Sequence, residues 1–487
     1  MTGNLLLALT LAPLLAAIGC LAVRRARLAE AINLLAGVVS LAAALPLPFL
    51  AGAKPELFLD DYVILDRAAA WVILCTAIVY FLASTYAVGY MRLLKEEERL
   101  PRFYALFAAF GFTTLVGPLM NSVGIYWIAI ELTTLVSTFL VAFEREAESM
   151  EAAWKYIMVV SAGISLALLG TVLFYWAGTF VLGPSYQMTW GVLAAAAPRM
   201  NPVVLTLAFL LVLIGYGTKV GLAPMHSWLP DAHSESPAPV SAMLSGALLN
   251  TAMVGIVRFL GVTGAAGLGP LPQLALVVFG VLSLAIGALF IVRQQGIKRL
   301  MAYSSIEHMG VVALGFGFGG PLGVAGALYH MLNHSLNKSL MFFGAGTVMR
   351  AYGTKEIRQI DGVLRRFPAQ GALWLAGAVA ITGAPPFGLF LSEFTIMRAG
   401  MTPSFSWAVY AMAVLLIVIF IGFINHFRAM YYRPTAEEVV EESRASAWCA
   451  VPMALAFVPL LVFGLWWPAG MWDYLTSVTQ SLSLGVP

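Results

Sequence analysis

Charged side chains are scarce in this chain of 487 residues. Asp, Glu, Lys and Arg make up only 10% of it, whereas hydrophobic residues make up 61%. Soluble globular domains carry about 25% charged residues, because these side chains cover the water-facing surface. The composition therefore excludes a soluble globular protein and predicts an all-α chain that crosses a membrane many times.

Cysteine is almost absent, and the motifs of bound cofactors are missing. The three cysteines, Cys20, Cys75 and Cys449, lie far apart and show no metal-binding or redox spacing. The chain contains no phosphate loop, dinucleotide fingerprint or Ser-His-Asp arrangement. We therefore expect no cofactor, metal or catalytic centre in this chain, and we interpret the cysteines as small apolar fillers. The net charge of +3 forms no basic patch for nucleic acid.

Long apolar runs, by contrast, occur along the whole chain. A helix needs about 20 apolar residues to cross about 30 Å of hydrocarbon. The sequence predicts about fourteen such spans, at residues 4–23, 31–52, 69–91, 103–120, 121–143, 153–177, 203–226, 239–262, 272–293, 299–318, 323–349, 370–397, 405–430 and 448–467. Only the turn at residues 118–122 separates the fourth span from the fifth, and residues 178–202 are expected to form a loop with a short surface helix.

Lysine and arginine are distributed unevenly among the predicted loops. Most of the 27 fall in alternate loops, for example at Arg24, Lys95, Arg358 and Arg444. Loops rich in Lys and Arg stay on the cytoplasmic side. This bias predicts a multi-pass protein of the cytoplasmic (inner) membrane whose two termini face outward.

Glycine and proline interrupt two of the predicted spans. The seventh contains Gly221 and Pro224 after Lys219, and the twelfth contains Pro385 and Pro386 before residue 393. Similar breaks in two halves of a chain indicate inverted repeats with a site near the membrane midplane, although proline kinks also serve packing alone. We predict two inverted five-helix repeats with broken helices 7 and 12. The predicted division is 1–102 (helices 1–3), 103–262 (first repeat, helices 4–8), 272–431 (second repeat, helices 9–13) and 448–487 (helix 14 and the C-terminal tail).

Lys219 and Glu131 are ionisable residues deep inside apolar spans. A charge at the centre of a membrane helix costs about 2.5–3.5 kcal/mol, so such groups face a polar interior and have partners. Lys219 and Lys155 are the nearest candidates to pair with Glu131. The alternatives are a static ion pair at Glu131 and, since Lys155 begins the sixth span, an ammonium that reaches the cytoplasmic surface.

The eleventh predicted span carries His330, His334 and Lys338 at four-residue intervals. Four residues turn a helix by about 400°, so the three side chains lie along one stripe, with Asn333 and Asn337 beside it. Histidine accepts and donates protons near neutral pH, which suits a proton wire. Zinc binding by His330 and His334 and a purely structural hydrogen-bonded stripe are the alternatives.

Three further ionisable residues complete the predicted polar axis. Glu307 and His308 lie about two turns inside the tenth span, and Glu393 follows the break in the twelfth. We expect these residues to join the others in a line across the membrane plane, along which one charge moves the next proton. His226 and His233, in the Pro-rich connection after the seventh span, are interpreted as polar capping residues of a packed cytoplasmic loop.

Several long motifs resemble one superfamily. Residues 219–231, 236–242, 298–305 and 330–346 are similar to the antiporter-like membrane subunits of respiratory complex I, multisubunit cation/proton antiporters and group 4 [NiFe] hydrogenases. The resemblance extends over nearly the whole chain. It implies proton-translocation roles for Glu131, Lys155, Lys219, Asn250, Glu307, His308, His330, His334, Lys338 and Glu393.

Two segments refine the resemblance. Residues 304–310 and 385–394 look most like the subunit of hydrogenase-4 and formate hydrogenlyase complexes. One position departs from the pattern, because several relatives have a lysine where this chain has Asn250. The relay across the eighth span then depends on a neutral side chain or on water bound around Asn250 and Ser245.

The resemblance implies a non-catalytic subunit that couples electron transfer in partner subunits to proton pumping. A [NiFe] centre and iron–sulfur clusters are then expected in those partners, with protons, or Na⁺, as the translocated ion. The alternatives are a component of a multisubunit Na⁺/H⁺ antiporter, a proton-pumping subunit of complex I, and a structural membrane anchor.

Overall fold

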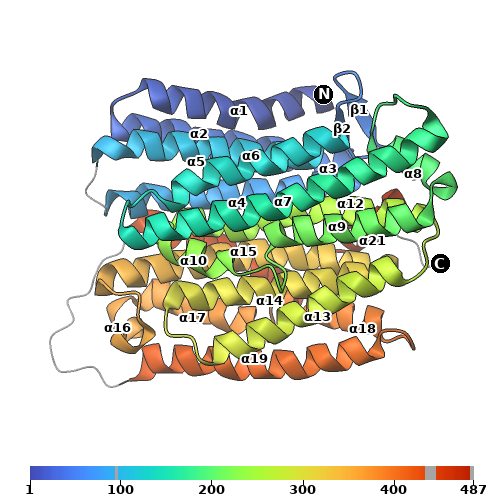
Figure 1. The fold of residues 1–487 in the computed structure, drawn as a ribbon. Helices are drawn as coiled ribbons and strands as arrows, with labels where there is room; N and C mark the ends of the chain where they lie inside the picture. Colours follow the sequence, from blue (N-terminus) through green and yellow to red (C-terminus); the bar gives the residue numbers. More distant parts are fainter. Residues whose placement is uncertain (94–96, 434–445, 483–487) are drawn as a thin grey trace.

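The computed structural model describes residues 1–93, 97–433 and 446–482, and nearly all of that part is helical (Figure 1). Helices satisfy their own backbone hydrogen bonds, which is what an apolar solvent demands. One short antiparallel hairpin, β1 (Glu56–Phe58) and β2 (Val63–Leu65), is the exception among the described residues. The helices are α1 (Thr2–Ala22), α2 (Ala26–Ala44), α3 (Leu47–Leu50), α4 (Arg67–Arg92), α5 (Leu100–Val116), α6 (Val123–Val141), α7 (Ala147–Leu182), α8 (Trp190–Ala196), α9 (Pro202–Val220), α10 (Trp228–Glu235), α11 (Ala238–Met243), α12 (Leu249–Ala265), α13 (Leu271–Val292), α14 (Ile297–Phe318), α15 (Gly320–Tyr352), α16 (Val363–Arg366), α17 (Pro368–Ile381), α18 (Gly388–Gly400), α19 (Ser406–Tyr432), α20 (Ala447–Leu465) and α21 (Ala469–Ser481).

The predicted polytopic helical fold is confirmed. Within the described part, 11 helical stretches are long and apolar enough to cross a membrane. Two more long helices, α14 and α15, contain the polar residues of the predicted axis, and α17 and α18 are the two parts of a broken helix. Each of the fourteen predicted spans coincides with one of these helices or broken pairs, with ends shifted by a few residues. The boundaries of the two repeats stay a prediction.

The weakest predicted features are also present. A short 3₁₀ turn, Gly117–Leu119, separates α5 from α6 at the predicted position. Proline at its centre lacks the N–H that a continuous helix needs. In the region expected to be a loop, α7 continues to Leu182 and the short helix α8 follows.

The two predicted breaks have the same local cause. Helix α9 ends at Gly221, whose φ of +80° is reached easily only by glycine, and α10 starts seven residues later. Helix α17 ends just before Gly383, with φ of +67°, and α18 begins at Gly388. In both places the backbone leaves its helix inside the protein, so polar side chains nearby can approach free backbone groups.

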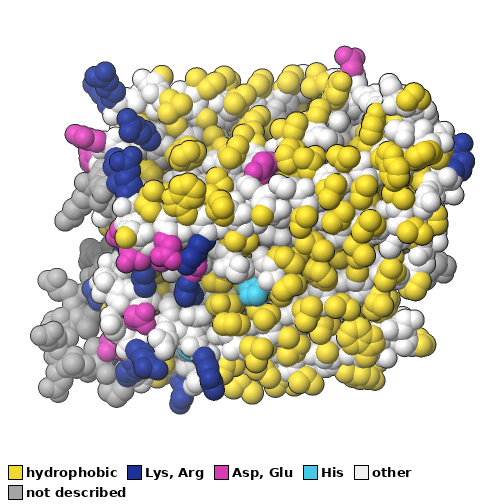
Figure 2. Space-filling view, viewed as in Figure 1, with side chains coloured by type: hydrophobic (Ala, Val, Ile, Leu, Met, Phe, Trp, Pro, Cys, Tyr) yellow, Lys and Arg dark blue, Asp and Glu magenta, His cyan; other side chains and the backbone are white. Residues whose placement is uncertain are grey.

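Charge is segregated along the long axis of the bundle. Lys and Arg side chains gather at one end of the visible face, and the middle is covered by hydrophobic side chains (Figure 2). Helix α1 begins, and α21 ends, at the opposite end (Figure 1). This arrangement agrees with the predicted topology, whereas the membrane side that each end faces stays a prediction. Lys95, Arg444 and residues 483–487 of the predicted tail lie outside the described residues.

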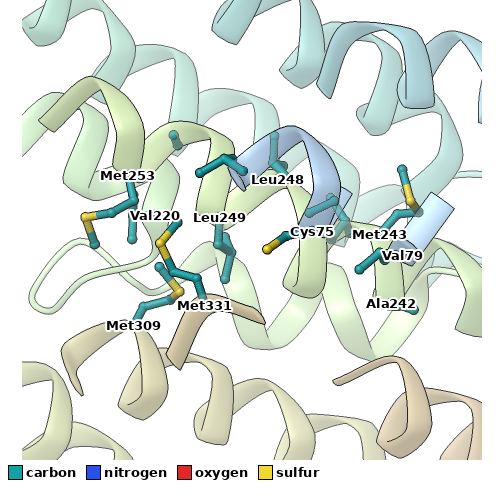
Figure 3. Packing of buried hydrophobic residues seen from close by; sticks show 14 of the residues in the cluster. Cys75, Val79, Val220, Ala242, Met243, Leu248, Leu249, Met253, Met309 and Met331 are labelled. Carbon is teal, nitrogen blue, oxygen red and sulfur yellow. The ribbon is translucent and has the colours of Figure 1, made fainter. Parts of the chain in front are cut away.

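An apolar core joins the two halves of the chain. Val220, Leu249, Met253, Met309 and Met331 belong to one buried cluster, which includes side chains of α4, α12, α14 and α15 (Figure 3). Several of these residues directly follow a polar residue of the predicted axis in the sequence. Residues of the predicted polar axis therefore lie next to side chains of the hydrophobic core.

Candidate functional site

Lys219 is fully buried at the end of α9, where the helix breaks. Its Nζ donates hydrogen bonds to Thr134 Oγ1 on α6 and to Tyr156 OH on α7, both at 2.8 Å. The Tyr156 hydroxyl also lies 2.7 Å from Ser137 Oγ. Two helices, α6 and α7, therefore supply the hydroxyl groups that satisfy this ammonium in an apolar setting.

Glu131 reaches Lys219 through a hydroxyl and not by a direct ion pair. Its Oε1 accepts a hydrogen bond of 2.7 Å from Ser161 Oγ, and its Oε2 accepts one of 3.3 Å from Thr134 Oγ1. Thr134 is thus the link between the carboxylate and the ammonium. We call Glu131, Thr134, Tyr156, Ser161 and Lys219 the Lys219 cluster. Glu131 itself is only partly buried.

Lys155 does not lie in the buried line. Its side chain is 51% exposed, and its Nζ forms ion pairs with Glu151 at 2.6 Å and Asp231 at 3.3 Å. Asp231 also pairs with Arg299. Since Lys155 lies in the third turn of α7, its flexible stem places the ammonium at the bundle surface, as the alternative interpretation expected.

Asn250 occupies the contact between α12 and α15. Its Nδ2 donates to Ser335 Oγ at 2.9 Å and to the Gly246 carbonyl at 3.1 Å, and its Oδ1 is buried without a partner. Residues 244–248, just before α12, form a π-helical turn. Such turns widen a helix locally and often occur at functional sites.

Lys338, on α15, lies beyond Asn250 of α12 and is also fully buried. Its Nζ donates to the Met301 carbonyl at 3.2 Å and to Ser304 Oγ on α14. The next residue, Ser305, lies 2.8 Å from Ser245 Oγ in the π-helical turn. Hydroxyl groups therefore extend from Lys338 toward the first half of the chain.

The predicted histidine stripe meets α14 and α18. His330 Nε2 lies 3.0 Å from His308 Nδ1, and His330 Nδ1 lies 2.8 Å from Ser392 Oγ. The His334 ring is 5.5 Å from the His308 ring, and neither of its nitrogens has a partner. The spacing argument thus placed His330 and His334 on one face of α15, with His308 opposite both.

Glu307 and Glu393 lie at the same place. Glu307 Oε2 is 3.4 Å from His308 Nε2. One carboxylate oxygen of Glu393 and ring nitrogens of His308 and His330 lie within 4.8 Å of one another. All four side chains are at least 95% buried. We call Glu307, His308, His330, His334 and Glu393 the histidine cluster, since it gathers the sequence-predicted acid/base residues of three helices.

The line is interrupted between Lys219 and Asn250. No hydrogen bond among the described residues joins the Lys219 cluster to Asn250 or to Lys338. The neighbouring side chains Val220, Leu249 and Met331 belong to the apolar core (Figure 3). The structure therefore contains two groups of polar residues that are separated by apolar side chains. We call Val220, Leu249 and Met331 the apolar contact.

His233 lies inside the bundle, although the sequence placed it in a loop. The expectation of a capping role in a loop is wrong: His233 lies in helix α10, is fully buried, and has no partner at either ring nitrogen. Its ring stacks on Phe342 of α15, with centroids 4.9 Å apart. The helical spacing of Trp228, Leu229 and Ala232 was the signal for a buried helix.

The two other polar residues near α10 have local roles. Lys298 is buried and its Nζ donates to the carbonyls of Ser234 and Ser236, at the C-terminal end of α10. Cations at that end complement the helix dipole. His226 lies in the break between α9 and α10, where its side chain is partly buried.

Sequence comparisons relate the chain to known proteins. Residues 121–421 match the family described as NADH:quinone oxidoreductase/Mrp antiporter, TM. The chain is 38% identical over 354 residues to the Hydrogenase-4 component F homolog of Methylacidiphilum infernorum, covering 71% of this chain and 74% of that protein. It is 29% identical to Hydrogenase-4 component B of Escherichia coli, covering 70% of this chain but only 51% of that protein.

The fold is shared with a solved respiratory complex. A chain of the membrane-bound sulfane sulfur reductase, an archaeal respiratory membrane complex, superposes with a TM-score of 0.88 at 23% identity, covering 98% of this chain and 97% of that chain. The family match spans both broken helices and every predicted axis residue. The chain belongs to the NADH:quinone oxidoreductase/Mrp antiporter transmembrane family.

Proposed function

We propose that this chain is the proton-translocating membrane subunit of a membrane-bound redox complex of the [NiFe] hydrogenase or formate hydrogenlyase type. The observation that carries the proposal is the set of buried ionisable residues on neighbouring helices, from Lys219 to the histidine cluster. Each charge in a membrane interior costs about 2.5–3.5 kcal/mol on insertion scales. Many buried ionisable groups lower the stability of a static fold without a comparable gain, whereas proton transfer requires such groups.

Proton movement starts at the Lys219 cluster. When the Glu131 carboxylate is linked to Lys219 through Thr134, its charge stabilises the ammonium. When Glu131 turns away, the buried ammonium loses that support and gives up a proton. The hydroxyls of Tyr156 and Ser137 offer both donor and acceptor atoms for the transfer.

The apolar contact beside Asn250 controls the passage of protons to the second half of the chain. A proton crosses it only when water enters, and the free Oδ1 of Asn250 and the Ser245–Ser305 pair provide the polar anchors for that water. Lys338 receives the proton, and the histidine cluster carries it toward Glu393. The contact thereby prevents free leakage between the two groups.

The redox chemistry is assigned to partner subunits. The named relatives are a homolog of hydrogenase-4 component F and hydrogenase-4 component B, so we place a [NiFe] centre and iron–sulfur clusters in hydrophilic partners. The positive end of the bundle faces these partners on the cytoplasmic side, and both termini face outward. Protons are the transported ion, since the axis is built from lysine, histidine and glutamate side chains, which take up and release protons.

The proposal is tested on the assembled complex in vesicles. A tagged chain should co-purify with a nickel-containing protein, and electron transfer should form a pH gradient. Lys219→Ala should abolish the gradient while leaving complex assembly and nickel content unchanged. Lys355→Ala, which alters an exposed lysine, is the control. A full gradient in the assembled Lys219→Ala complex would refute the relay.

A second function is favoured by the family itself, whose description includes Mrp antiporters. As a component of a multisubunit Na⁺/H⁺ antiporter, the chain would exchange ions without redox partners. A related alternative is a proton-pumping subunit of complex I. Purified complexes without nickel, together with Na⁺-driven pH changes in vesicles that lack a redox substrate, would favour the antiporter.

A further inference from the structure

We propose that His308, His330 and Glu393 form a binding site for a divalent transition metal of the Zn²⁺ class. The three residues come from α14, α15 and α18, and one ligand atom from each lies within 4.8 Å of the other two. The two imidazole atoms that face each other, His308 Nδ1 and His330 Nε2, are 3.0 Å apart. Tetrahedral zinc places its nitrogen ligands at about 2.0–2.1 Å from the metal. A small opening of the pair therefore accommodates the ion.

One of the two histidines, His330, already has a supporting group at its other ring nitrogen. Histidines that bind a metal donate their other ring N–H to a carboxylate, carbonyl or similar acceptor. His330 Nδ1 lies 2.8 Å from Ser392 Oγ, and His308 Nε2 lies 3.4 Å from Glu307 Oε2. His330 thus presents Nε2 to the proposed ion and Nδ1 to a supporting hydroxyl, whereas His308 Nε2 has no hydrogen-bond partner among the described residues.

Unsatisfied polar atoms mark the same place. Glu393 Oε1 and both carboxylate oxygens of Glu307 are buried and have no hydrogen-bond partner in the described part of the chain. A buried polar group without a partner costs about 1–3 kcal/mol, more if it is charged. A bound cation would satisfy Glu393 directly, and the two carboxylates would balance its two charges in the apolar interior.

The donor set selects the metal. Two imidazoles and one carboxylate suit Zn²⁺ and similar ions, whereas Na⁺, Mg²⁺ and Ca²⁺ prefer sites made of oxygen atoms. Three protein ligands leave a fourth position for water, as in open zinc sites. A cavity of about 380 Å³ borders Glu393 and the break at Thr382 and Gly383, and it provides the approach.

Zinc at this site would stop the relay. The ion would hold His308, His330 and Glu393 at once, so none of them could accept a proton from Lys338. This consequence rests on the proposed function, whereas the metal site itself does not. Redox-driven pumping should then be lost at saturating zinc and return when a chelator is added.

The site is tested by counting zinc on the intact purified complex. Equilibrium dialysis with radioactive zinc should find one site fewer per chain in Glu393→Gln and His330→Ala complexes than in the wild type. The control is His426→Ala on α19, a partly buried histidine whose Nε2 lies 2.7 Å from the Ile291 carbonyl. It should keep the wild-type number.

The outcomes separate the two proposals. Equal zinc binding in wild-type, Glu393→Gln and His330→Ala complexes overturns the metal site, and Glu393→Gln keeps this decisive if His330→Ala fails to assemble. Loss of one zinc in both variants, with no effect of zinc on wild-type pumping, supports the metal site and contradicts the relay through it.

Discussion

At the scale of single residues, the main feature is that a hydroxyl separates the buried lysine from its carboxylate. A direct Glu131–Lys219 pair would be held by strong attraction in an apolar medium, and its separation would be slow and costly. Thr134 lengthens the link and gives it a group that both donates and accepts. Small movements of α6 can then change the coupling between the two charges.

Thr134→Val should uncouple the Glu131 carboxylate from the Lys219 ammonium. Valine keeps the shape of threonine but removes the hydroxyl, and a hydrogen bond to a charged group contributes about 1.5–3 kcal/mol. We expect a fall in pumping of at least roughly tenfold at normal redox activity, by conversion of that energy. Thr138→Val is the control, because Thr138 Oγ1 bonds only to the Thr134 carbonyl of its own helix. Equal effects of the two variants would contradict the role of Thr134.

Lys155→Ala should have a small effect. The lysine is half exposed and its ion pairs lie at the surface, where such pairs contribute about 0–1 kcal/mol. We therefore expect most of the pH gradient to remain in vesicles with the assembled complex. A complete loss of pumping would show that Lys155 takes part in the relay, as the family resemblance implied.

The sequence predicted the charged residues of the site but not their partners. Lysine, histidine and glutamate are conspicuous in an apolar span, because their burial is costly. Hydroxyl residues such as Thr134 and Ser304 are not, since Ser and Thr in helices commonly bond to their own backbone. Which of them turns toward Lys219 or Lys338 depends on helix packing that no local pattern records.

At the scale of elements, the broken helices place the ionisable groups. The break after α17 brings the backbone of Gly383 against the Glu393 carboxylate, so closely that any side chain there must displace Glu393. Glycine is needed at this position for its positive φ as well. The loop and the carboxylate are therefore fitted to each other.

Gly383→Ala should impair pumping by moving Glu393. Gly353→Ala is the matched control, because Gly353 has φ of +64°, close to the +67° of Gly383, but open space where the Cβ would lie. Both substitutions should cost about 1–2 kcal/mol of stability from the left-handed backbone. Only Gly383→Ala should also reduce the redox-driven pH gradient. Similar pumping in the two assembled variants would contradict the fit at Glu393.

The breaks were predicted and α10 was not, although Trp228, Leu229 and Ala232 follow a helical spacing. Glycine and proline after a long apolar run indicate a helix end wherever they occur. Helix α10 is only 8 residues long and contains a proline, so its sequence resembles that of a loop. Its burial, and with it the position of His233, follows from packing against α7 and α14.

At the scale of the whole molecule, contacts between distant segments assemble the axis. Trp71 Nε1 of α4 donates to the Leu328 carbonyl of α15, and Tyr86 OH donates to the Phe343 carbonyl, both at 2.8 Å. The number of spans and the charge bias of the loops could be read from the sequence, because the thickness of the membrane and the sidedness of its loops determine them. The lateral order of the helices could not be read from the sequence, because an apolar helix surface does not specify which other helix packs against it.

The orientation of the bundle can be measured by cysteine labelling. Lys54→Cys should react with a membrane-impermeant maleimide in intact cells, whereas Arg358→Cys should react only after the cells are opened. Both positions are exposed and lie at opposite ends of the predicted topology, and all three native cysteines are buried. The reverse pattern would show that the termini face the cytoplasm.

The most direct test of the account is Lys338→Ala in the purified complex reconstituted into vesicles. Lys338 is fully buried and donates hydrogen bonds to α14, and in the proposed relay it receives the proton before the histidine cluster. We predict that electron transfer continues while the pH gradient falls to background. An undiminished pH gradient in the assembled variant would contradict the proton line through this chain.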